Sequence, residues 1–495
     1  MVKTIHLLFI FIFTSLFGFS QRIDAVWPIG YDCCIYPNFG AMNMDFTSGN
    51  LNVITVQRHQ NFDETCASAC DLNGNILFSS NGIYVANSLD DTMQNGSGLN
   101  PSYYTNLHSQ YGLTHPQGNL VLPSLTDTNQ YILIHNTIDD YFSTGASLYL
   151  YTSTIDMNQI GGLGAVVNKN TIIYTDSMTP GRIVATRHAN GRDWWITVRK
   201  YRSQKLIEFL YTPSGISGPY FQNLSIQREF NIGQSAFNPQ GTKYAYFEAI
   251  RGLEVADFDR CTGQLSNQVF CNIIDTVYYG AGVCFSPNGR FLYVATVERV
   301  YQLDTWSPNM NASKVVVGIL DGFADPITSN ITAFWIMALG PDGKIYMSTG
   351  NSTPYLHVIN NPDSMGIACD LCQHCIQLPA LNAFTMPNFP NYYLGAEVGS
   401  VCDSLTNSVS ELHKINSEIS VYPNPAKDNA TIKYLISKDA LLIIINSLGE
   451  VVQEISLSAE NQSTTIDLSK FKNGAYTCKV VQEGKVDVGR LIVMH

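Results

Sequence analysis

The chain has 495 residues, of which 45% are hydrophobic, 11% aromatic and 14% charged, and 28 Lys and Arg against 40 Asp and Glu give a formal net charge of −12. This length predicts two to four domains, and the low charge together with 37 Gly and 27 Tyr indicates a β-rich extracellular protein. No run of basic residues follows the pattern that tracks phosphates, so we do not expect a nucleic-acid partner.

Residues 1–20 have the anatomy of an export signal. Lys3 supplies the positive charge, residues 7–19 form an apolar run, and Gly18 and Ser20 place small residues before Gln21. The alternative is an uncleaved membrane anchor, but an apolar run of roughly 13 residues is shorter than the about 20 that a membrane span needs. We therefore expect cleavage between Ser20 and Gln21.

A strand–turn–strand phrase then recurs about every fifty residues. Pro starts its turn, Asn or Asp tolerates the bend, and Gly takes the position with positive φ, so each copy predicts a β-hairpin. The clearest copies span residues 236–246, 283–294 and 337–347, and weaker ones lie at 73–78, 127–132 and 190–195.

Two further strand-like runs follow the hairpins, for example residues 300–304 and 314–320. Four strands per repeat of about fifty residues form the blade of a β-propeller, so we predict an all-β, WD40-like propeller over residues 27–402. Six turns mark six blades. Residues 42–56 together with residues 392–398 can supply a seventh that closes the ring, so we predict seven blades, with six as the alternative.

Four phrases in this region resemble the propeller regions of surface proteins from gliding bacteria: residues 74–82, 93–99, 258–263 and 386–392. The resemblance covers roughly residues 27–404. It implies the propeller architecture, and because that family has no well-defined activity, it implies no function.

Residues 403–418 are polar and lack the repeat, which indicates a linker. Residues 419–495 then contain several short alternating runs separated by turns, which predict a small immunoglobulin-like β-sandwich. The phrase Tyr422-Pro423-Asn424-Pro425, the turn at 447–450 and the Gly474-Ala475-Tyr476 strand resemble the type A C-terminal sorting domain of type IX secretion substrates. The resemblance implies export by the type IX machinery, removal of this domain and attachment to surface lipopolysaccharide. Arg490 stands where the family usually has Lys, and the charge is kept.

The 12 cysteines of an exported chain are expected to form disulfides. Cys261 and Cys271 flank a turn between two strand-like runs, so we predict a cross-strand disulfide between them, which requires Cα atoms within about 7 Å. Cys369, Cys372 and Cys375, with His374 among them, have spacing that also occurs in metal sites. A structural zinc site needs a second ligand pair, and only Cys402 is a candidate, so disulfides are favoured and no metal is expected.

No nucleophile elbow, zinc-protease helix or phosphate loop occurs, and we expect no cofactor. Residues 71–75 imitate the start of a calcium loop but lack its later Gly and Glu, so a hairpin turn is favoured. Trp194 and Trp195 are adjacent, and strand alternation would send one ring into the core and the other outward, where it could stack on a glycan.

Two functions stay open. The first is a non-enzymatic binding or adhesion protein of the cell surface that uses the propeller as an interaction platform for a glycan or protein. The alternative is a secreted propeller hydrolase or lyase that acts on polysaccharide. Clustered carboxylates with His or Arg at the channel mouth would favour an enzyme, and an apolar or amide-lined mouth would favour binding. The absence of a catalytic motif favours binding.

Overall fold

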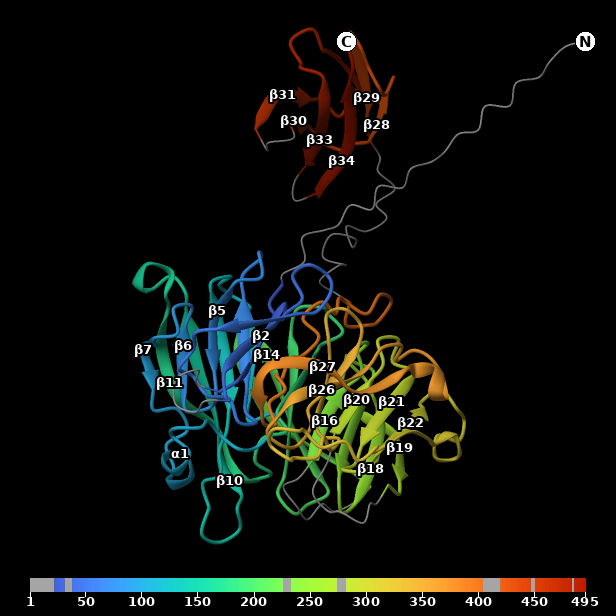
Figure 1. Cartoon of the computed structure of the whole chain (residues 1–495). Coiled ribbons are helices and arrows are strands. Elements are labelled where there is room, and N and C mark those ends of the chain that lie inside the picture. The colour runs from blue at the N-terminus through green and yellow to red at the C-terminus, as the bar shows by residue number, and fades with distance from the viewer. Residues whose placement is uncertain are drawn as a thin grey trace, which may run out of the picture. The chain divides into compact units, whose positions relative to one another are not determined.

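The computed structural model describes residues 22–31, 38–225, 233–273, 282–403, 419–446, 450–482 and 485–495. The chain divides into two compact units, Met1–Asp403 and Ser404–His495 (Figure 1). The predicted cleavage site at Ser20 and Gln21 and most of the predicted linker lie outside the described residues. Within the described residues, no helix is both long enough and apolar enough to cross a membrane.

The described residues of the first unit form mainly antiparallel strands and one short α-helix, α1 (Tyr103–Leu107). One sheet has three strands and another has eight. Their bounds are β1 (Val26–Gly30), β2 (Ala41–Asp45) and β3 (Asn52–Val56), then β4 (Ala67–Cys70), β5 (Ile76–Ser80), β6 (Tyr84–Asn87), β7 (Thr92–Ser97), β8 (Asn119–Pro123), β9 (Gln130–His135), β10 (Ser147–Asp156) and β11 (Ala165–Met178).

Four further sheets have four strands each, and in each the strand order follows the chain. They consist of β12 (Val184–Arg187), β13 (Trp194–Arg199), β14 (Lys205–Thr212) and β15 (Gly215–Asn223); β16 (Gly233–Phe237), β17 (Lys243–Glu248), β18 (Gly252–Phe258) and β19 (Leu265–Cys271); β20 (Gly282–Phe285), β21 (Phe291–Ala295), β22 (Arg299–Asp304) and β23 (Val315–Ile319); and β24 (Met337–Leu339), β25 (Ile345–Met347), β26 (Thr353–Ile359) and β27 (Leu371–Asn382).

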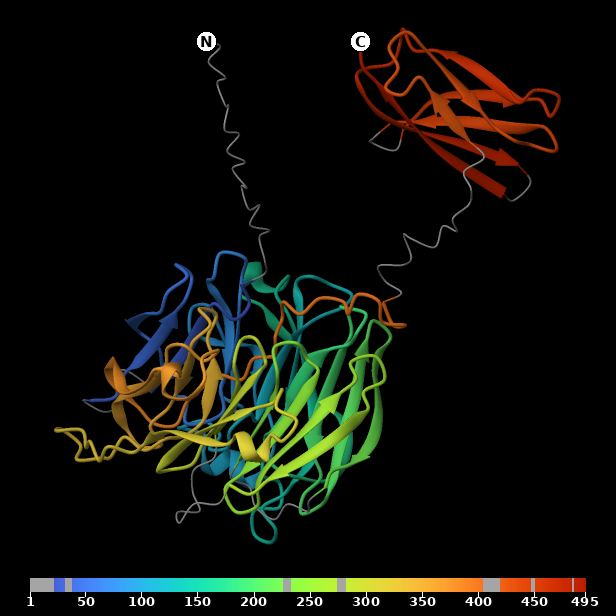
Figure 2. The ribbon, with the colours of Figure 1, turned by 90° about the vertical axis from the view of Figure 1, so that its right-hand side faces the viewer.

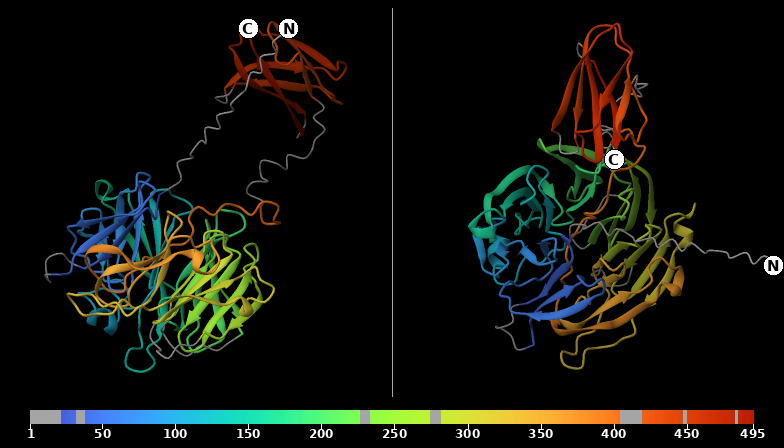
Figure 3. Two further views of the ribbon diagram at one scale, coloured as in Figure 1. Left: turned by 45° about the vertical axis from the view of Figure 1, so that its right-hand side comes forward. Right: turned by 90° about the horizontal axis from the view of Figure 1, so that it is seen from above.

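These sheets stand around a common axis as the blades of a β-propeller (Figures 2 and 3). The eight-stranded sheet is two four-stranded meanders, β4–β7 and β8–β11, joined by a short parallel pairing of β7 with β11. The first strands of neighbouring meanders contact one another around the axis, for example β12 with β16 and β16 with β20. The predicted all-β propeller class is therefore confirmed.

The ring closes differently from the prediction. Residues 42–56 supply β2 and β3, but their partner strand is β1 and not residues 392–398, so that part of the prediction is wrong. The outer strand β27 lies against β1, β2 and β3 instead. Residues 392–398 form no strand, and Tyr392 is buried with its hydroxyl donating to the Val121 carbonyl at 2.8 Å.

The repeated turns explain why the hairpins form where the sequence predicts them. In the turn between β16 and β17, the Asn238 side-chain oxygen accepts from the Thr242 and Lys243 amides at 2.7 and 2.9 Å. Gly241 has φ +70°, and a Cβ there would lie 2.4 Å from Oγ1 of Thr186 in the preceding sheet. A residue without a side chain is needed both for the conformation and for the approach of the neighbouring blade.

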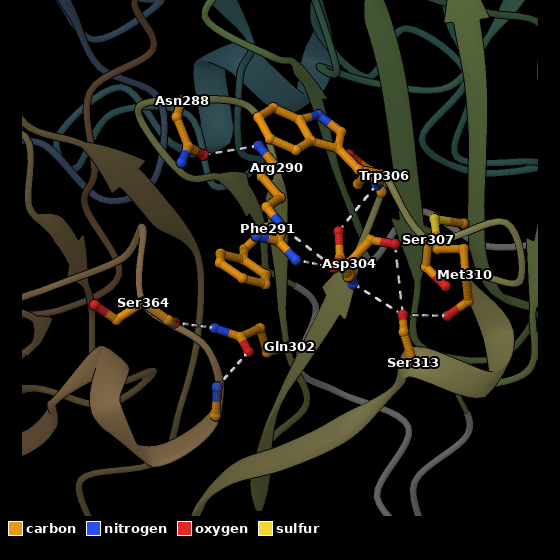
Figure 4. A network of polar contacts seen from close by, with 12 residues as sticks. Asn288, Arg290, Phe291, Gln302, Asp304, Trp306, Ser307, Met310, Ser313 and Ser364 are labelled. Carbon is orange, nitrogen blue, oxygen red and sulfur yellow. Dashed lines mark hydrogen bonds and ion pairs between the residues drawn. The ribbon is translucent and has the colours of Figure 1, made fainter.

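An ion pair recurs beside these turns. Lys243 pairs with Asp257 in one sheet, and Arg290 pairs with Asp304 at 2.7 Å in the next (Figure 4). In both sheets the cation follows the glycine of the turn and the carboxylate ends the third strand or lies next to its end. The same type of pair therefore fixes the hairpin to the third strand in these two neighbouring sheets.

We call the end of the first strands that carries these turns the turn end, and the opposite end the mouth end. Each first strand enters from the mouth end and leaves at the turn end, because its hairpin turn to the second strand follows it directly. Residues that precede first strands therefore gather at the mouth end, and the repeated turns gather at the turn end.

The predicted disulfide between Cys261 and Cys271 is wrong. Cys261 is bonded to Cys402, with Cα atoms 5.5 Å apart, and Cys271 is a buried thiol. Cys261 lies in the turn before β19, whereas Cys271 ends that strand opposite Leu253. Seven extended residues span about 20 Å, so the hairpin ladder separates the two sulfurs that sequence proximity suggested.

The Cys-rich motif holds a disulfide between Cys372 and Cys375, as favoured from the sequence, and Cys369 is a buried thiol. In the part of the chain that the structure describes, no three His, Cys, Asp or Glu side chains are grouped to hold a metal ion. The calcium-like residues form a hairpin turn in which the Asp71 carboxylate accepts from the Asn73 and Asn75 amides, both at 2.8 Å, which confirms the turn interpretation.

The second unit contains two antiparallel sheets that share one core. Buried Ile432, Leu442, Ile466 and Leu491 come from both sheets and pack together. The first sheet orders β28 (Ser420–Tyr422), β29 (Asn429–Lys433) and β32 (Ser463–Asp467), and the second orders β31 (Val451–Leu457), β30 (Ala440–Ile445), β33 (Gly474–Gln482) and β34 (Lys485–Val493).

Candidate ligand-binding sites of the propeller

A cavity of about 580 Å³ opens between the first strands at the turn end, and we call it the channel pocket. Its walls come from the first strands β12, β16, β20 and β24, and its rim includes the prolines of the three clear repeats, Pro239, Pro287 and Pro341. This volume is in the range of pockets that hold small ligands. The turns from which the sequence predicts the propeller therefore also line the rim of the pocket.

The segment after the last sheet returns into this channel. Nδ2 of Asn388 donates to the carbonyls of Asn119 and Ile183 at 2.9 and 2.8 Å, which joins the first strand β8 to the segment that leads into β12. Asn391 donates to the Pro239 carbonyl at 2.7 Å. The Met-Pro-Asn-Phe-Pro-Asn-Tyr phrase at residues 386–392 is thus the piece of chain that satisfies backbone carbonyls facing the axis.

Two glutamines cross the channel in the same way. Gln117 donates to the Ser235 carbonyl and accepts from the Ser235 amide, both at 2.9 Å. Gln234 accepts from the Val283 and Met337 amides at 2.9 and 3.1 Å and donates to the Met337 carbonyl at 2.7 Å. We call Gln117, Gln234 and Asn388 the channel amides. Their neutral side chains pair with backbone N–H and C=O groups of the first strands, as the backbone of a neighbouring strand would.

The described residues that line the channel pocket include one carboxylate, Asp24, and no His, Lys or Arg. Asp24 accepts a hydrogen bond from the Tyr393 hydroxyl, and burial raises the pKa of this carboxyl. The remaining lining is aliphatic, aromatic, amide and hydroxyl. Such a pocket provides shape and hydrogen bonds to a neutral polar ligand.

The mouth end has the opposite chemistry. Asp63 and Glu64 precede β4, His115 precedes β8 and Arg182 precedes β12, and we call these four residues the charged group. Glu64 accepts from the indole nitrogen of Trp335 at 3.2 Å. Arg182 is fully buried, and its Nη1 donates to the Pro180 carbonyl at 2.8 Å.

Burial shifts the protonation of this group. It raises the pKa of Glu64 to about 8, with the neighbouring Asp63 adding to the shift and Arg182 opposing it. It also raises the pKa of Asp63 to about 7. The pKa of His115 falls to about 3, because burial and the positive charge of Arg182 both disfavour the imidazolium. The mouth end therefore offers two carboxyl groups that hold protons near neutral pH and one neutral imidazole.

Three exposed rings lie beside this mouth, and we call Tyr103, Tyr141 and Phe142 the aromatic patch. The Tyr103 ring is 5.6 Å from that of Tyr141 and 4.6 Å from that of Phe142. Tyr103 belongs to α1 and the other two to the loop between β9 and β10, which both lie at the lower end of the propeller in Figure 1. Tyr104 links the patch to the charged group, because its ring is 5.6 Å from Tyr141 and 6.2 Å from His115.

The predicted stacking role for Trp194 or Trp195 is wrong, because both indoles are buried, Trp195 with 5% of its surface exposed. The Trp195 nitrogen donates to the Arg260 carbonyl at 2.9 Å, and the turn at Gly263 of the next sheet packs against the ring. Both faces of a propeller blade are covered by neighbours, so alternation sends the two rings into two cores. The exposed tryptophan is Trp306, 61% exposed, with the Arg290 guanidinium 5.5 Å from its ring (Figure 4).

The sequence patterns do not reveal the charged group or the aromatic patch. The charged group comes from three separate segments without a motif, at Asp63-Glu64, His115 and Arg182, and their only shared signal is a position just before a first strand. The aromatic patch has a weak signal, since Tyr103-Tyr104 and Tyr141-Phe142 are aromatic pairs outside the repeats.

Comparison with known proteins identifies the family of the C-terminal domain. Residues 420–494 match the family described as the secretion system C-terminal sorting domain. The sorting-domain prediction is confirmed, and this domain indicates a secreted or outer-surface protein that engages the type IX secretion machinery. No curated protein matches the chain.

Solved structures with similar outlines are distant. A proposed 6-phosphogluconolactonase from Bacteroides uniformis ATCC 8492 is 12% identical, with 72% of this chain and 97% of that chain covered and a TM-score of 0.41. A protein from Lactobacillus plantarum is 12% identical, with 90% and 100% covered and a TM-score of 0.36. The β-propeller domain of Myceliophteria thermophila Cps50 (Swd1) is 11% identical, with 66% and 96% covered and a TM-score of 0.37. No activity is transferred from them.

Proposed function

We propose that this protein is a non-enzymatic binding protein of the cell surface, with a seven-bladed propeller as its interaction platform. The blades are β1–β3, the two meanders β4–β7 and β8–β11, and the four four-stranded sheets. The observation that carries the proposal is the channel pocket, a cavity of about 580 Å³ lined by amides and apolar side chains with a single carboxylate. Its ligand is a neutral polar molecule of the size of a short glycan or peptide.

A pocket-filling variant tests this assignment. Ala338 lines the channel pocket on β24, and Ala338→Phe would fill part of the cavity. The chain from Gln21 to His495 is screened on a glycan and peptide array, and hits are measured by calorimetry. We expect Ala338→Phe to weaken binding at least tenfold and Ala312→Phe, on an exposed turn outside the pocket, to leave it unchanged. Equal loss in both variants, or no ligand at all, would sink the proposal.

We further propose that residues 27–402 form the propeller, that residues 403–418 link it to an immunoglobulin-like sorting domain at 419–495, and that this domain is removed at the cell surface before attachment to lipopolysaccharide. The family match at residues 420–494 supports this maturation. Intact-mass analysis of surface protein is expected to show a chain that starts at Gln21 and ends near residue 419. Recovery of the full-length chain from the surface contradicts the scheme.

A second candidate, a polysaccharide hydrolase or lyase, is favoured by the charged group at the mouth end. Asp63 and Glu64 are neighbouring carboxyl groups with raised pKa values, and His115 supplies a neutral imidazole. Shifted pKa values of this kind are common where proton transfer occurs. Product analysis of polysaccharides incubated with the protein separates the two functions: products that disappear with Glu64→Gln support the enzyme, and unchanged polysaccharide supports binding alone.

A further inference from the structure

The aromatic patch is an exposed surface on a protein whose other large rings are mostly buried. The exposed fractions are 53% for Tyr103, 41% for Tyr141 and 79% for Phe142. Leu107 and Tyr111 extend the apolar surface along the segment that carries α1. Exposed aromatic rings gathered at one place on a soluble protein mark an interaction site more often than scattered single residues do.

The patch is held in a fixed shape. Ser102 caps α1 and accepts from the Thr105 amide at 3.0 Å. On the other side, the Asp139 carboxylate accepts from the Leu148 amide at 2.7 Å, and Asp140 accepts from the Thr144 hydroxyl at 2.8 Å. A ligand that stacks on these rings therefore meets a surface that is already ordered, and little conformational entropy is lost on binding.

The size of the patch decides which class of partner fits it. Three rings with these exposed fractions offer on the order of 400 Å². A stable protein–protein interface buries about 800 Å² on each partner, so the three rings alone do not make up such an interface. One face of a pyranose ring carries several C–H groups and is similar in area to an aromatic ring. Its weakly positive C–H hydrogens complement the weak negative charge on the face of the aromatic ring.

We infer that the aromatic patch is a stacking subsite for a polysaccharide chain that lies along α1 and the loop between β9 and β10, above the buried Tyr104 and beside the charged group at the mouth end. Tyr104 connects the two, and its hydroxyl is hydrogen-bonded to that of Thr114. The site is separate from the channel pocket, because none of its residues lines that cavity. It replaces the stacking role that the sequence suggested for the buried tryptophans.

Affinity electrophoresis tests the inference on the chain from Gln21 to His495. Native gels contain soluble xylan, laminarin or polygalacturonate, so neutral and acidic chains are compared directly. We expect at least one polysaccharide to retard the protein and the double variant Tyr103→Ala/Phe142→Ala to lose at least tenfold in affinity. Both side chains are exposed, so the thermal unfolding midpoint is expected to stay within a few degrees of the parent.

Two control variants distinguish this site from nonspecific apolar adsorption and from the channel pocket. Ile367→Ala removes an apolar side chain that is 87% exposed and lies outside the patch, and it is expected to bind as the parent does. Ala338→Phe is expected to keep the retardation, so a failure of the channel-pocket proposal does not affect this one. Unchanged retardation in the double variant, no retardation by any of the three polysaccharides, or instead binding to phosphatidylcholine vesicles that depends on Phe142, would each overturn the inference.

Discussion

The two ends of the propeller channel are formed by the same first strands and differ completely in chemistry. The turn end is framed by Pro239, Pro287 and Pro341, and the pocket that opens there is closed below by the neutral channel amides, which cross near the start of the first strands. The mouth end gathers Glu64 and Arg182, both buried and with shifted pKa values. The comparison shows that the repeated turns determine which residues line one end of the channel. The segments that connect the repeats determine which residues line the other end.

The difference also predicts how each end responds to change. In the channel pocket, hydrogen bonds of the channel amides join strands from different sheets, so removing one partner leaves buried backbone groups without a partner and lowers stability at every pH. At the mouth end, the buried groups titrate, so substitutions change how stability depends on pH. The predictions below test that contrast, starting with the largest effect.

Removal of the disulfide between Cys261 and Cys402 has the largest expected effect. The bond joins residues 141 positions apart, and loop-entropy estimates assign about 4–5 kcal/mol to such a closure. It ties the chain after the propeller to the turn end, where the Glu397 amide also donates to the Ala189 carbonyl at 2.8 Å. We expect Cys261→Ser/Cys402→Ser to lower the free energy of unfolding by that order, measured by denaturation under oxidising conditions.

The second disulfide provides a matched control. Cys372 and Cys375 are three positions apart, and the same estimate assigns about 2 kcal/mol to closing so short a loop. Cys372→Ser/Cys375→Ser is therefore expected to cost less than half as much. Equal losses in the two double variants would show that the bond between Cys261 and Cys402 does not hold the turn end together.

Loss of a channel amide is the next largest effect. Gln234→Leu keeps the approximate volume but leaves the Val283 amide and both backbone groups of Met337 without their side-chain partner. Each buried unpaired group costs about 1–3 kcal/mol, so for three such groups we expect a total loss of about 3–4 kcal/mol, at the lower end of that range, measured by chemical denaturation. Gln268→Leu, an exposed glutamine that donates to the Asn223 carbonyl, is expected to change stability by less than about 0.5 kcal/mol. Similar values for the two variants would contradict a bracing role of the channel amides.

The same difference between the repeated turns and the connecting segments decides which parts of the structure the sequence predicts. The hairpins with Pro–x–Gly turns lie at their predicted positions, because Gly241 and its equivalents meet a local conformational requirement that is visible in the sequence. The third and fourth strands after them, such as β22 and β23, also lie where the alternating runs indicate. Local chemistry determines these elements, so local reasoning finds them.

What the sequence does not predict depends on distant parts of the chain. The partner of Cys261 lies 141 positions away, and nothing near Cys402 identifies it. The burial of Trp195 follows from the turn at Gly263 in the next sheet, which covers the face that alternation would leave open. Glu64 and Arg182 are brought to one place only by closure of the ring, so no spacing in the sequence connects them.

Substitution of the buried tryptophan tests the corrected role of that residue. Trp195→Phe removes the hydrogen bond to the Arg260 carbonyl and part of a buried ring, and we expect a loss of about 1–2 kcal/mol in the free energy of unfolding. Trp306→Phe changes a ring that is 61% exposed and is expected to have almost no effect. Retardation by polysaccharide is expected to be unchanged in Trp195→Phe. Loss of retardation in a variant that remains folded would show that Trp195 contributes to polysaccharide binding.

The smallest expected effect is a change in pH dependence at the mouth end. The folded state raises the pKa of Glu64 to about 8, so it keeps a proton that the unfolded chain has already released, and the free energy of unfolding falls as the pH rises from about 4.5 to about 8. Glu64→Gln removes that penalty while keeping an oxygen for the Trp335 indole. The variant is expected to match the parent near pH 4 and to exceed it by at least about 1 kcal/mol at pH 8. His115, with its pKa lowered to about 3, acts in the opposite direction below about pH 6.5 and is not affected by the change. Asp91→Asn, at an exposed turn, serves as control in denaturation measured across this range.

The contradicting outcome is that Glu64→Gln and the parent lose stability in parallel up to pH 8. Glu64 would then be ionised in the folded protein, and the chemical contrast between the two ends of the channel would be smaller than the burial of Glu64 indicates.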